Sequence, residues 1–479
     1  MDARTTVLLA AWALVGFADR SPSRPAGYFV APPPTGSSDG TGSRARPWDL
    51  ATGLTGGGGR VQPGDTVWLL GGTYRGAYRT ELRGTAERPI VFRQHPGDRA
   101  TIDGTLRADG AFLTFWGFEI MQSHPTTYGL QANTAHGRFI NLVVHDAGNQ
   151  GISYWTPAVD AELYGCIVYN NGTHENLDHG VYVHNELGTK LLADNIFFNN
   201  LARGIQVYAS RKNPEIRNVR IEGNISFNNG TISPRASART NLLVNAQVPT
   251  SGMVVVGNLV YFSGASGVNI RLGRYDARNN KDIVLQGNYA AGGAVVLEME
   301  APWDRAVVAD NVLIGPRDIV RLAGAAVGRT YQWHGNAHYR DPAARAWRYE
   351  GAAYDLAEWR RVTGLGATDS VRSRPSTPQV FVRSNKYERG RAHIVVYNWS
   401  RQPTVPADLA GVLRVGDRYE VRNVQDFFGA PVLRGSYDGR PIGIPMQGVD
   451  PPRPLGGGRA TSIPPRTGPE FDVFVLTRP

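Results

Sequence analysis

Histidine, tyrosine and arginine side chains recur in the middle of this 479-residue chain at spacings that suit proton transfer on a charged substrate. In Gly180-Val-Tyr-Val-His, the alternation of a β-strand turns Val181 and Val183 inwards and leaves Tyr182 and His184 facing outwards. The same alternation in the neighbouring segments predicts two outward columns. The first column is predicted to hold Gln131, Ser153, Tyr182, Gln206, Leu243, Asn269 and Val296. The second column is predicted to hold Asn133, Trp155, His184, Tyr208, Asn245, Arg271 and Glu298.

A column that holds Trp, His, Tyr, Asn, Arg and Glu together is typical of a sugar-binding face, and one reaction that these residue types would suit is cleavage of a uronate by β-elimination. That reaction needs a base beside C5 of the uronate, an acid for the leaving oxygen and a group that neutralises the carboxylate. The predicted catalytic residues, which supply base, acid and charge, are His179, His184, Tyr208 and Arg203. The predicted substrate-binding residues are Trp155, Tyr182, Gln206, Lys212, Arg239, Asn245 and Arg271. His179 has an equal alternative role, as a bend residue that bonds the neighbouring coil.

Two other functions stay open at the level of the sequence. A glycoside hydrolase needs two carboxyl groups about 5–9.5 Å apart, and the candidates are Glu175, Asp178 and Glu298. A non-catalytic protein would bind a glycan through the same aromatic and polar columns. Ca²⁺ is one option for neutralising a uronate carboxylate, but Asp and Glu in loops are commonly turn formers, so no metal ligand is assigned.

The elements that carry these columns are short strands in a repeating pattern. One set of strand-like tetrapeptides recurs every 23 to 34 residues and starts at Asn141, Cys166, Asn195, Asn224, Asn258, Asn288 and Asn311. A second set starts at Gly151, Gly180, Gly204, Asn241, Gly267 and Ala294. Two strand signals per period, with turns between them, predict one solenoid coil per repeat. Because an Asn in the same place on each coil can hydrogen-bond to the next, we expect a parallel β-helix with a buried Asn ladder.

At these repeats the chain resembles the right-handed parallel β-helix, or pectin-lyase-like, superfamily of secreted carbohydrate-active enzymes. The resemblance covers about residues 28–335, and the segments 36–43, 61–69, 72–74 and 86–92 are similar to the first coils of such proteins. It implies a polysaccharide lyase, a glycoside hydrolase, an epimerase or a glycan-binding spike. The Trp-Ile-Asp-His signature of pectate lyases is absent, as are the polygalacturonase motifs and those of alginate and chondroitin lyases. The resemblance therefore implies the fold without choosing the reaction.

The N-terminal apolar run and the cysteine content indicate where the protein is located. The run Thr5–Ala18 is apolar but too short to cross a bilayer, which predicts a signal peptide and a secreted or periplasmic protein. No other stretch is apolar enough to enter a membrane. The single cysteine excludes an internal disulfide, and Cys166 fits a small buried ladder position better than a catalytic thiol.

The net charge of the chain indicates which classes of molecule it could bind. A net charge of +10 favours an acidic partner. A basic helix, a zinc pattern and an RNA-binding motif are all missing, which argues against nucleic acid. The predicted partner is therefore an anionic polysaccharide or oligosaccharide, bound by a monomer.

The predicted fold class is all-β, with a right-handed β-helix followed by a smaller β-sandwich. The predicted order is a signal peptide at 1–20, a Pro/Gly/Ser-rich leader at 21–45, the β-helix at 46–335, a helical connector at 336–375 and the sandwich at 376–479. Residues 47–54 are expected to form a short capping helix, and Asp355–Val362 is the clearest helical segment, with Gly364 as its stop signal. After Thr377, short strands separated by Gly/Pro turns predict a sandwich that packs on the solenoid or holds substrate.

Overall fold

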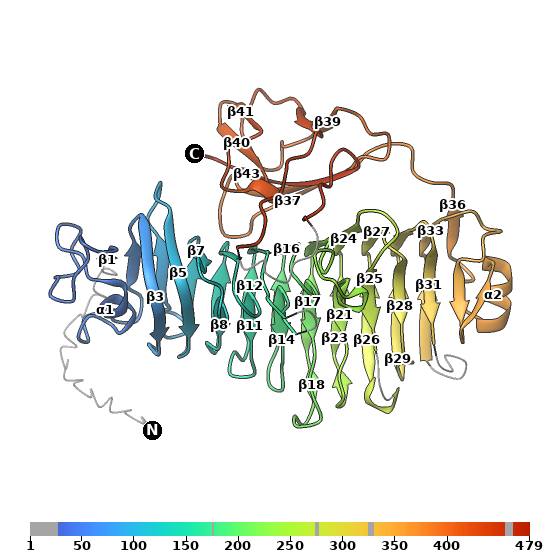
Figure 1. Ribbon diagram of the computed structural model, residues 1–479, viewed down its shortest axis with the longest axis horizontal. Coiled ribbons are helices and arrows are strands. Elements are labelled where there is room, and N and C mark those ends of the chain that lie inside the picture. Colours follow the sequence, from blue (N-terminus) through green and yellow to red (C-terminus); the bar gives the residue numbers. More distant parts are fainter. Residues whose placement is uncertain (1–26, 175–176, 274–276, 324–329, 456–462) are drawn as a thin grey trace, which may run out of the picture.

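The computed structural model describes residues 27–174, 177–273, 277–323, 330–455 and 463–479. The predicted signal peptide and Glu175 lie outside these residues. Figure 1 shows a long solenoid of stacked coils, with the C-terminal domain lying along one side of it. In the described part of the chain, none of the helices combines the length and the apolar character that a membrane crossing requires.

Three stacks of parallel strands run along the solenoid, and each coil adds one strand to each stack. We call the first stack the open face. It contains β8 (Leu130–Ala132), β11 (Ile152–Tyr154), β14 (Val181–Val183), β17 (Ile205–Val207), β21 (Thr240–Val244), β25 (Val268–Leu272), β28 (Val295–Met299), β31 (Asp318–Leu322) and β34 (Trp347–Tyr349). We call the second stack the covered face. It contains β7 (Glu119–Met121), β10 (Val143–His145), β13 (Ile167–Tyr169), β16 (Ile196–Phe198), β20 (Ile225–Phe227), β24 (Leu259–Phe262), β27 (Tyr289–Gly292), β30 (Val312–Ile314), β33 (Ala337–Tyr339) and β36 (Ser370–Arg372).

The third stack completes the triangular coil and forms a sheet of its own. It contains β1 (Gly27–Val30), β2 (Thr66–Leu69), β4 (Ile90–Gln94), β6 (Leu113–Trp116), β9 (Arg138–Ile140), β12 (Ala161–Tyr164), β15 (Lys190–Ala193), β19 (Val219–Glu222), β23 (Met253–Val256), β26 (Asp282–Gln286), β29 (Arg305–Ala309) and β32 (Thr330–His334). Near the N-terminus two longer strands, β3 (Gly72–Thr80) and β5 (Ala100–Ala108), pair along their whole length. Inward Leu, Ile, Val and Phe side chains of the three stacks fill one continuous core, because strand alternation turns every second residue inwards.

Both ends of the solenoid reach beyond the predicted boundaries. At the N-terminal end, β1 lies inside the segment predicted as a leader, because its residues pair with β2 and bury Val30 in the core. The short helix α1 (Leu50–Leu54) caps this end, with the Asp49 carboxylate accepting from the backbone N–H of Thr52 at 2.7 Å. At the C-terminal end, β33, β34 and β36 continue the stacks through the segment predicted as a connector.

The predicted helix in this last segment is confirmed as α2 (Leu356–Thr363). A capping box between Asp355 and Glu358 starts it, and Gly364 ends it in the left-handed conformation at φ 69°. Trp359 is fully buried, so α2 closes the open core at the C-terminal end.

The predicted Asn ladder is present at the corner between the third stack and the covered face. Each Asn side-chain N–H donates to the side-chain oxygen of the Asn one coil further, as from Asn195 to Asn224 at 2.9 Å, and the ladder continues beyond the prediction to Asn336 and Asp369. Cys166 occupies one position, as expected, and burial raises its pKa to about 12. Asn141 was misaligned by one residue, because Val143 pairs with Ile167 and places Leu142 opposite Cys166.

A second Asn ladder, which the sequence analysis missed, lies at the corner between the covered and open faces. Its members are Asn171, Asn200, Asn229, Asn241 and Asn269. These side chains are buried and each bonds to the next, so this corner is fixed over four successive coils, with Asn229 and Asn241 in the same coil.

Aromatic residues point outwards from the covered face and stack on one another. The rings of Tyr169, Phe198 and Phe227 follow at centroid distances of 4.9 and 5.0 Å. An exposed apolar row of this length would be costly in water, and the C-terminal domain covers it with Tyr397 and Phe471, among others. The sandwich therefore packs on the solenoid, which is one of the two roles predicted for it.

The C-terminal domain consists of two antiparallel sheets around their own core, as predicted. The larger sheet has the order β37 (Gln379–Ser384), β38 (Ala392–Tyr397), β43 (Phe471–Thr477), β40 (Arg418–Asn423) and β41 (Leu433–Ser436). The smaller sheet pairs β39 (Thr404–Ala407) with β42 (Ile442–Pro445). One side of the larger sheet packs on the smaller sheet and the other packs on the solenoid.

Candidate functional site

The open face carries the first predicted column over its first five coils. Strand register aligns Gln131 with Ser153, then Tyr182, Gln206 and Leu243, each directly opposite the next. The alternation read from the sequence therefore places these residues correctly. Successive members lie about 4.8 Å apart, the spacing of neighbouring strands.

After Leu243 the predicted columns are wrong by two residues. Leu243 pairs with Arg271, and Arg271 pairs with Glu298, so both charged residues continue the first column. Asn269 instead belongs to the second Asn ladder, and Val296 is fully buried. Gly267 precedes its paired strand by two more residues than the earlier turn glycines do, and the sequence pattern alone does not reveal this difference. Shifting the register of a strand by two residues keeps its inward side chains pointing inwards. The pattern of core residues is therefore the same in both registers and does not reveal the error.

Tyr182 lies at the centre of an aromatic cluster on the open face. Its ring centroid is 5.0 Å from that of Trp155, 6.1 Å from that of Tyr208 and 5.8 Å from that of His179. Trp155, Tyr182 and Tyr208 are partly exposed and come from three successive coils. The structure therefore brings together four of the residues predicted for catalysis and binding, with flat apolar surfaces of the kind that pack against sugar rings.

His179 lies beneath this cluster and is only 1% exposed. Its Nδ1 accepts a hydrogen bond from the backbone N–H of Arg203, one coil further, at 3.4 Å. Burial, together with the positive charge of Arg203, holds the pKa of His179 well below its usual range, so the ring is neutral. This geometry matches the alternative role of a residue that bonds the neighbouring coil.

His184 and Tyr208 follow one another along the second column. Each comes directly after a paired strand residue, Val183 and Val207, so their backbones lie one coil apart. Burial lowers the pKa of His184, although the negative charge of Glu186 opposes this shift. His184 Nε2 lies 3.3 Å from Glu186 Oε1.

Several buried polar atoms of the open face have no hydrogen-bond partner among the described residues. They are Ser153 Oγ, His184 Nε2, Asn245 Oδ1 and Arg239 Nε. Buried polar groups are nearly always satisfied in folded proteins, so each of these atoms is a position where a ligand group can supply the missing partner. Sugar hydroxyl groups donate and accept hydrogen bonds and are suited to this role.

Lys190, which the sequence analysis did not single out, supports this part of the open face from inside. It is fully buried, and its Nζ donates to the backbone carbonyls of Tyr154 at 3.3 Å, His184 at 2.6 Å and Trp155. Burial holds the pKa of Lys190 well below its usual range. The strand alternation that turns Leu192 inwards also turns Lys190 inwards, so the same sequence pattern could have revealed it.

Other predicted residues lie in loops and turns next to the open-face strands. Lys212 is exposed in a loop, and Arg239 lies in the turn before β21. The carboxylate of Asp178 accepts from the backbone N–H groups of Thr173 and His174 at 2.9 and 2.6 Å, so it shapes its own loop. This is the turn-forming role.

Arg271 and Glu298 form a separate charged cluster further along the open face. Arg271 Nε lies 2.7 Å from Glu298 Oε2 and 3.4 Å from Glu300 Oε1. Glu298 also lies 3.5 Å from Arg321 of the next coil. Glu298 and Glu300 therefore share one guanidinium partner.

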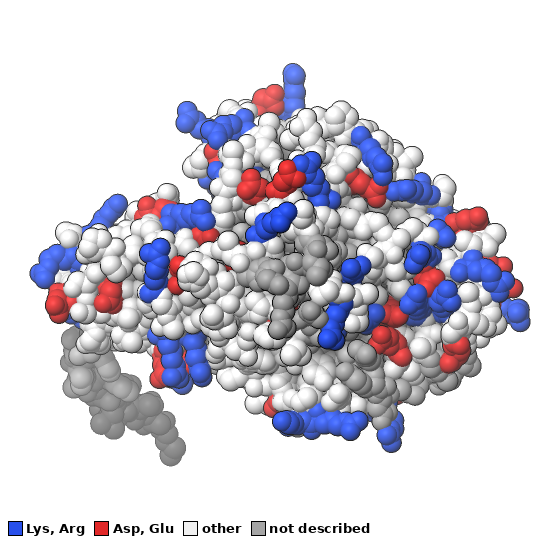
Figure 2. All heavy atoms as spheres, in the orientation of Figure 1, with Lys and Arg blue, Asp and Glu red and all other residues white. Residues whose placement is uncertain are grey.

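The described residues show neither a single basic patch on the face in view nor a group of side chains suited to a metal ion. Figure 2 shows Lys and Arg spread over the solenoid and the C-terminal domain, many beside Asp or Glu, rather than gathered in one patch on that face. Within the described ranges no group of three or more His, Cys, Asp and Glu residues has a geometry that could hold a metal ion.

Comparison with known proteins concerns the fold. Residues 28–242 match the family model described as the Pel9A-like, right-handed β-helix region. Pectate lyase Pel9A is 15% identical, with 74% of this chain and 78% of that chain covered and a TM-score of 0.46. An alginate lyase from Paenibacillus sp. str. FPU-7 is 17% identical, with 55% and 94% covered and a TM-score of 0.37. XylC, solved in complex with xylose, is 9% identical, with 94% and 100% covered and a TM-score of 0.46. No curated protein sequence matches the chain.

Proposed function

We propose that this right-handed parallel β-helix binds and cleaves an acidic, uronate-containing polysaccharide on its open face, by β-elimination. The observation that carries the proposal is the coincidence of two features over three coils. The partly exposed rings of Trp155, Tyr182 and Tyr208 lie where Ser153 Oγ and His184 Nε2 have no hydrogen-bond partner among the described residues. The match to the Pel9A-like model covers all of these coils.

The proposed roles follow from exposure and protonation. Tyr208 is partly exposed, so we assign its hydroxyl to protonating the leaving glycosidic oxygen. His184 has a lowered pKa and is neutral at pH 7, as a base that removes the C5 proton must be. Its Nε2 is enclosed beside Glu186, so contact with C5 requires the substrate to displace this neighbour. Arg203 supplies positive charge for the carboxylate, and buried His179 positions the backbone of Arg203 through their hydrogen bond.

The experiment that tests this function measures two products at once on a panel of acidic and neutral polysaccharides. β-Elimination creates an unsaturated uronate that absorbs in the ultraviolet, together with a new reducing end. Tyr208→Phe keeps the ring and removes the hydroxyl, and we expect it to lower the rate by about 10²–10⁴-fold. The matched control is Tyr349→Phe, which removes a partly exposed tyrosine hydroxyl further along the same face.

Three outcomes would contradict the proposal. Full activity in a folded Tyr208→Phe variant would place the chemistry elsewhere. New reducing ends without ultraviolet absorbance would show hydrolysis. Binding without either product would indicate a non-catalytic glycan-binding protein.

Hydrolysis is a second candidate because Glu298 and Glu300 both approach Arg271. Two carboxylates on one outward strand end could act as the acid and base, or nucleophile, of a glycoside hydrolase. The ion pairs of Glu298 with Arg271 and Arg321 also describe a purely stabilising cluster. Glu300→Gln separates the two roles, since it should abolish hydrolysis and leave elimination unchanged.

We also propose that the protein is exported, with residues 1–20 removed as a signal peptide. Expression of the full chain in a bacterium and N-terminal sequencing of the extracellular or periplasmic product would test this. An intact N-terminus on protein that stays in the cytoplasm would contradict it.

A further inference from the structure

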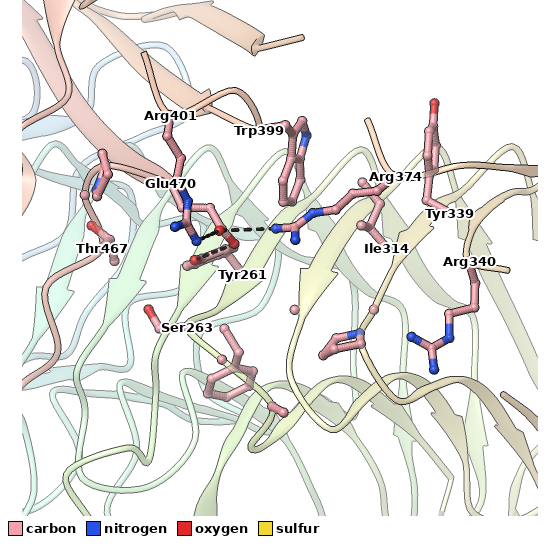
Figure 3. A pocket seen from close by; sticks show the side chains of 18 of the residues that line it. Tyr261, Ser263, Ile314, Tyr339, Arg340, Arg374, Trp399, Arg401, Thr467 and Glu470 are labelled. Atoms are coloured by element: carbon pink, nitrogen blue, oxygen red, sulfur yellow. Dashed lines mark hydrogen bonds and ion pairs between the residues drawn. The ribbon is translucent and has the colours of Figure 1, made fainter. Parts of the chain in front are cut away.

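A cavity of about 670 Å³ lies between the covered face and the C-terminal domain, on a different side of the solenoid from the aromatic cluster. Its solenoid side is formed by residues that follow β24, β30 and β33, among them Ser263 and Arg340. Its other side is formed by Trp399, Arg401 and Glu470 of the C-terminal domain, as Figure 3 shows. Cavities that hold small organic ligands usually have volumes of about 300–1,000 Å³, so a short oligosaccharide would fit.

The aromatic part of the cavity is held in place by its neighbours. The indole N–H of Trp399 donates to the hydroxyl of Tyr289 at 3.0 Å, and its ring stacks on Tyr397 at a centroid distance of 5.9 Å. Tyr261 stacks on Phe471 at 4.3 Å. Because these contacts fix the rings before any ligand arrives, Trp399 is an ordered aromatic wall of the cavity, with the guanidinium of Arg374 5.5 Å from its ring centroid.

The charged groups of the cavity carry an excess of arginine. The charged lining residues are Arg340, Asp341, Arg374, Arg401, Arg466 and Glu470. Glu470 Oε2 accepts from Arg374 at 3.2 Å and from Arg401 at 2.9 Å, so one carboxylate is shared by two guanidinium groups. Arg466 pairs with Asp450 outside the cavity. Two arginines against one carboxylate leave positive charge facing the cavity.

Arg340 lies on the opposite side of the cavity from Arg401 and Glu470, as Figure 3 shows. Its Nε is buried and has no hydrogen-bond partner among the described residues. A buried guanidinium N–H without an acceptor is costly, and a carboxylate is the ligand group that satisfies it best.

We propose that this cavity is a second carbohydrate site that binds an acidic oligosaccharide, with a sugar ring on Trp399 and its carboxylate on Arg340 and Arg374. The choice of an acidic glycan rests on the proposed function of the open face, and the site would hold the polymer while the open face acts on it.

Calorimetric titration tests the proposal without relying on cleavage. The probes are hexasaccharides of galacturonate and of mannuronate, with neutral xylohexaose for comparison. All titrations use the full chain carrying Tyr208→Phe, so that turnover does not obscure binding. We expect Arg340→Gln to weaken binding of an acidic hexasaccharide by about tenfold or more, the worth of one charged hydrogen bond. The control is Arg418→Gln, an exposed arginine of the C-terminal domain outside the cavity.

The site is supported if Arg340→Gln and Trp399→Ala weaken acidic binding, Arg418→Gln does not, and turnover of short substrates by the Arg340→Gln single variant stays normal. It is overturned if both cavity variants bind as tightly as their parent, which would place all binding elsewhere. It is also overturned if xylohexaose binds as well as the acidic probes, or if no probe binds. If the wild-type chain cleaves none of the substrates, the proposed function is contradicted but the cavity proposal is not, because binding at the cavity is measured separately.

Discussion

The open and covered faces use the same coils for opposite purposes. Both are built from three-to-five-residue strands with the same inward core, and they differ in the side chains that point outwards. The covered face stacks Tyr169, Phe198 and Phe227 and is buried by the C-terminal domain. The open face presents Trp155 and Tyr182 beside polar atoms and is only partly enclosed. The outward residues therefore decide which face becomes a domain interface and which stays partly open to solvent.

The most severe test of this contrast compares two aromatic residues of one coil. Phe198 on the covered face is fully buried, so Phe198→Ala should lower the free energy of unfolding by about 3–5 kcal/mol. Tyr208 on the open face is partly exposed, and Tyr208→Ala should cost about 1 kcal/mol or less. Urea unfolding of both variants measures the difference. Equal losses would mean that the open face is held together like a core.

A smaller effect is expected at the corner that joins the two faces. Asn200 bonds to Asn171, Asn229 and the carbonyl of Val168, so Asn200→Ala leaves several buried groups without partners and should cost about 2–4 kcal/mol. The matched control is Asn213→Ala, in a loop where the side chain accepts only from Ser210. If the corner positions the open face, Asn200→Ala also slows turnover below its unfolding midpoint. Unchanged stability would show that the ladder contributes little.

The smallest expected effect is a difference in how the faces respond to pH. Burial opposes the charge of His145 on the covered face, but hydrogen bonds to Asp146 and Glu119 outweigh it and raise the pKa of this residue. The stability that His145 contributes is therefore present below pH 6.5 and is lost as pH rises through the raised pKa. His179 has a lowered pKa, so its contribution is present above pH 6.5 and is lost as pH falls below that value.

Unfolding of two single variants at two pH values measures this difference. We expect His145→Gln to be more harmful at about pH 5.5 than at about pH 7.5, and His179→Gln to show the reverse, each by about 1 kcal/mol. The same pH response in both variants would contradict the assigned protonation states. It would also remove one distinction between the faces.

The coils could be predicted from the sequence because the patterns that form them, strand alternation and one Asn per repeat, are contained in short segments. Strand alternation places Tyr182 and Gln206 correctly, and a residue that recurs once per coil predicts the Asn ladder without knowledge of the whole fold. The helix at 356–363 also follows from its own ends, Asp355 and Gly364.

The register was less predictable, because turns of unequal length separate the strands. Gly267 lies two residues further from its strand than the earlier turn glycines, and this moved Asn269 and Arg271 into the wrong columns. The covered face left a signal that was overlooked: the third residue after each ladder position includes Tyr169, Phe198, Phe227 and Tyr261. A regular outward aromatic row predicts a partner surface.

Roles at the candidate site could be predicted only by residue type. The sequence proposes both His179 and His184 as catalytic residues and gives only His179 an equal structural role. The hydrogen bond from the backbone of Arg203 to His179 shows that structural role in the folded chain. Lys190 and the cavity at Trp399 depend on contacts between distant segments, which no local pattern contains.

The way in which the C-terminal domain crosses the coils has a further consequence. Arg383 donates to the carbonyls of Gly223 and Gly257, and Tyr397 donates to those of Val260 and Tyr289, so single side chains tie neighbouring coils together. A solenoid alone behaves as a row of units that fray one at a time, because each unit touches only its neighbours. Because the C-terminal domain bonds to several neighbouring coils at once, we expect the central coils to unfold together. Proteases should therefore cleave first at the coils that the C-terminal domain does not cover, near α1 and α2, and leave the middle of the solenoid intact.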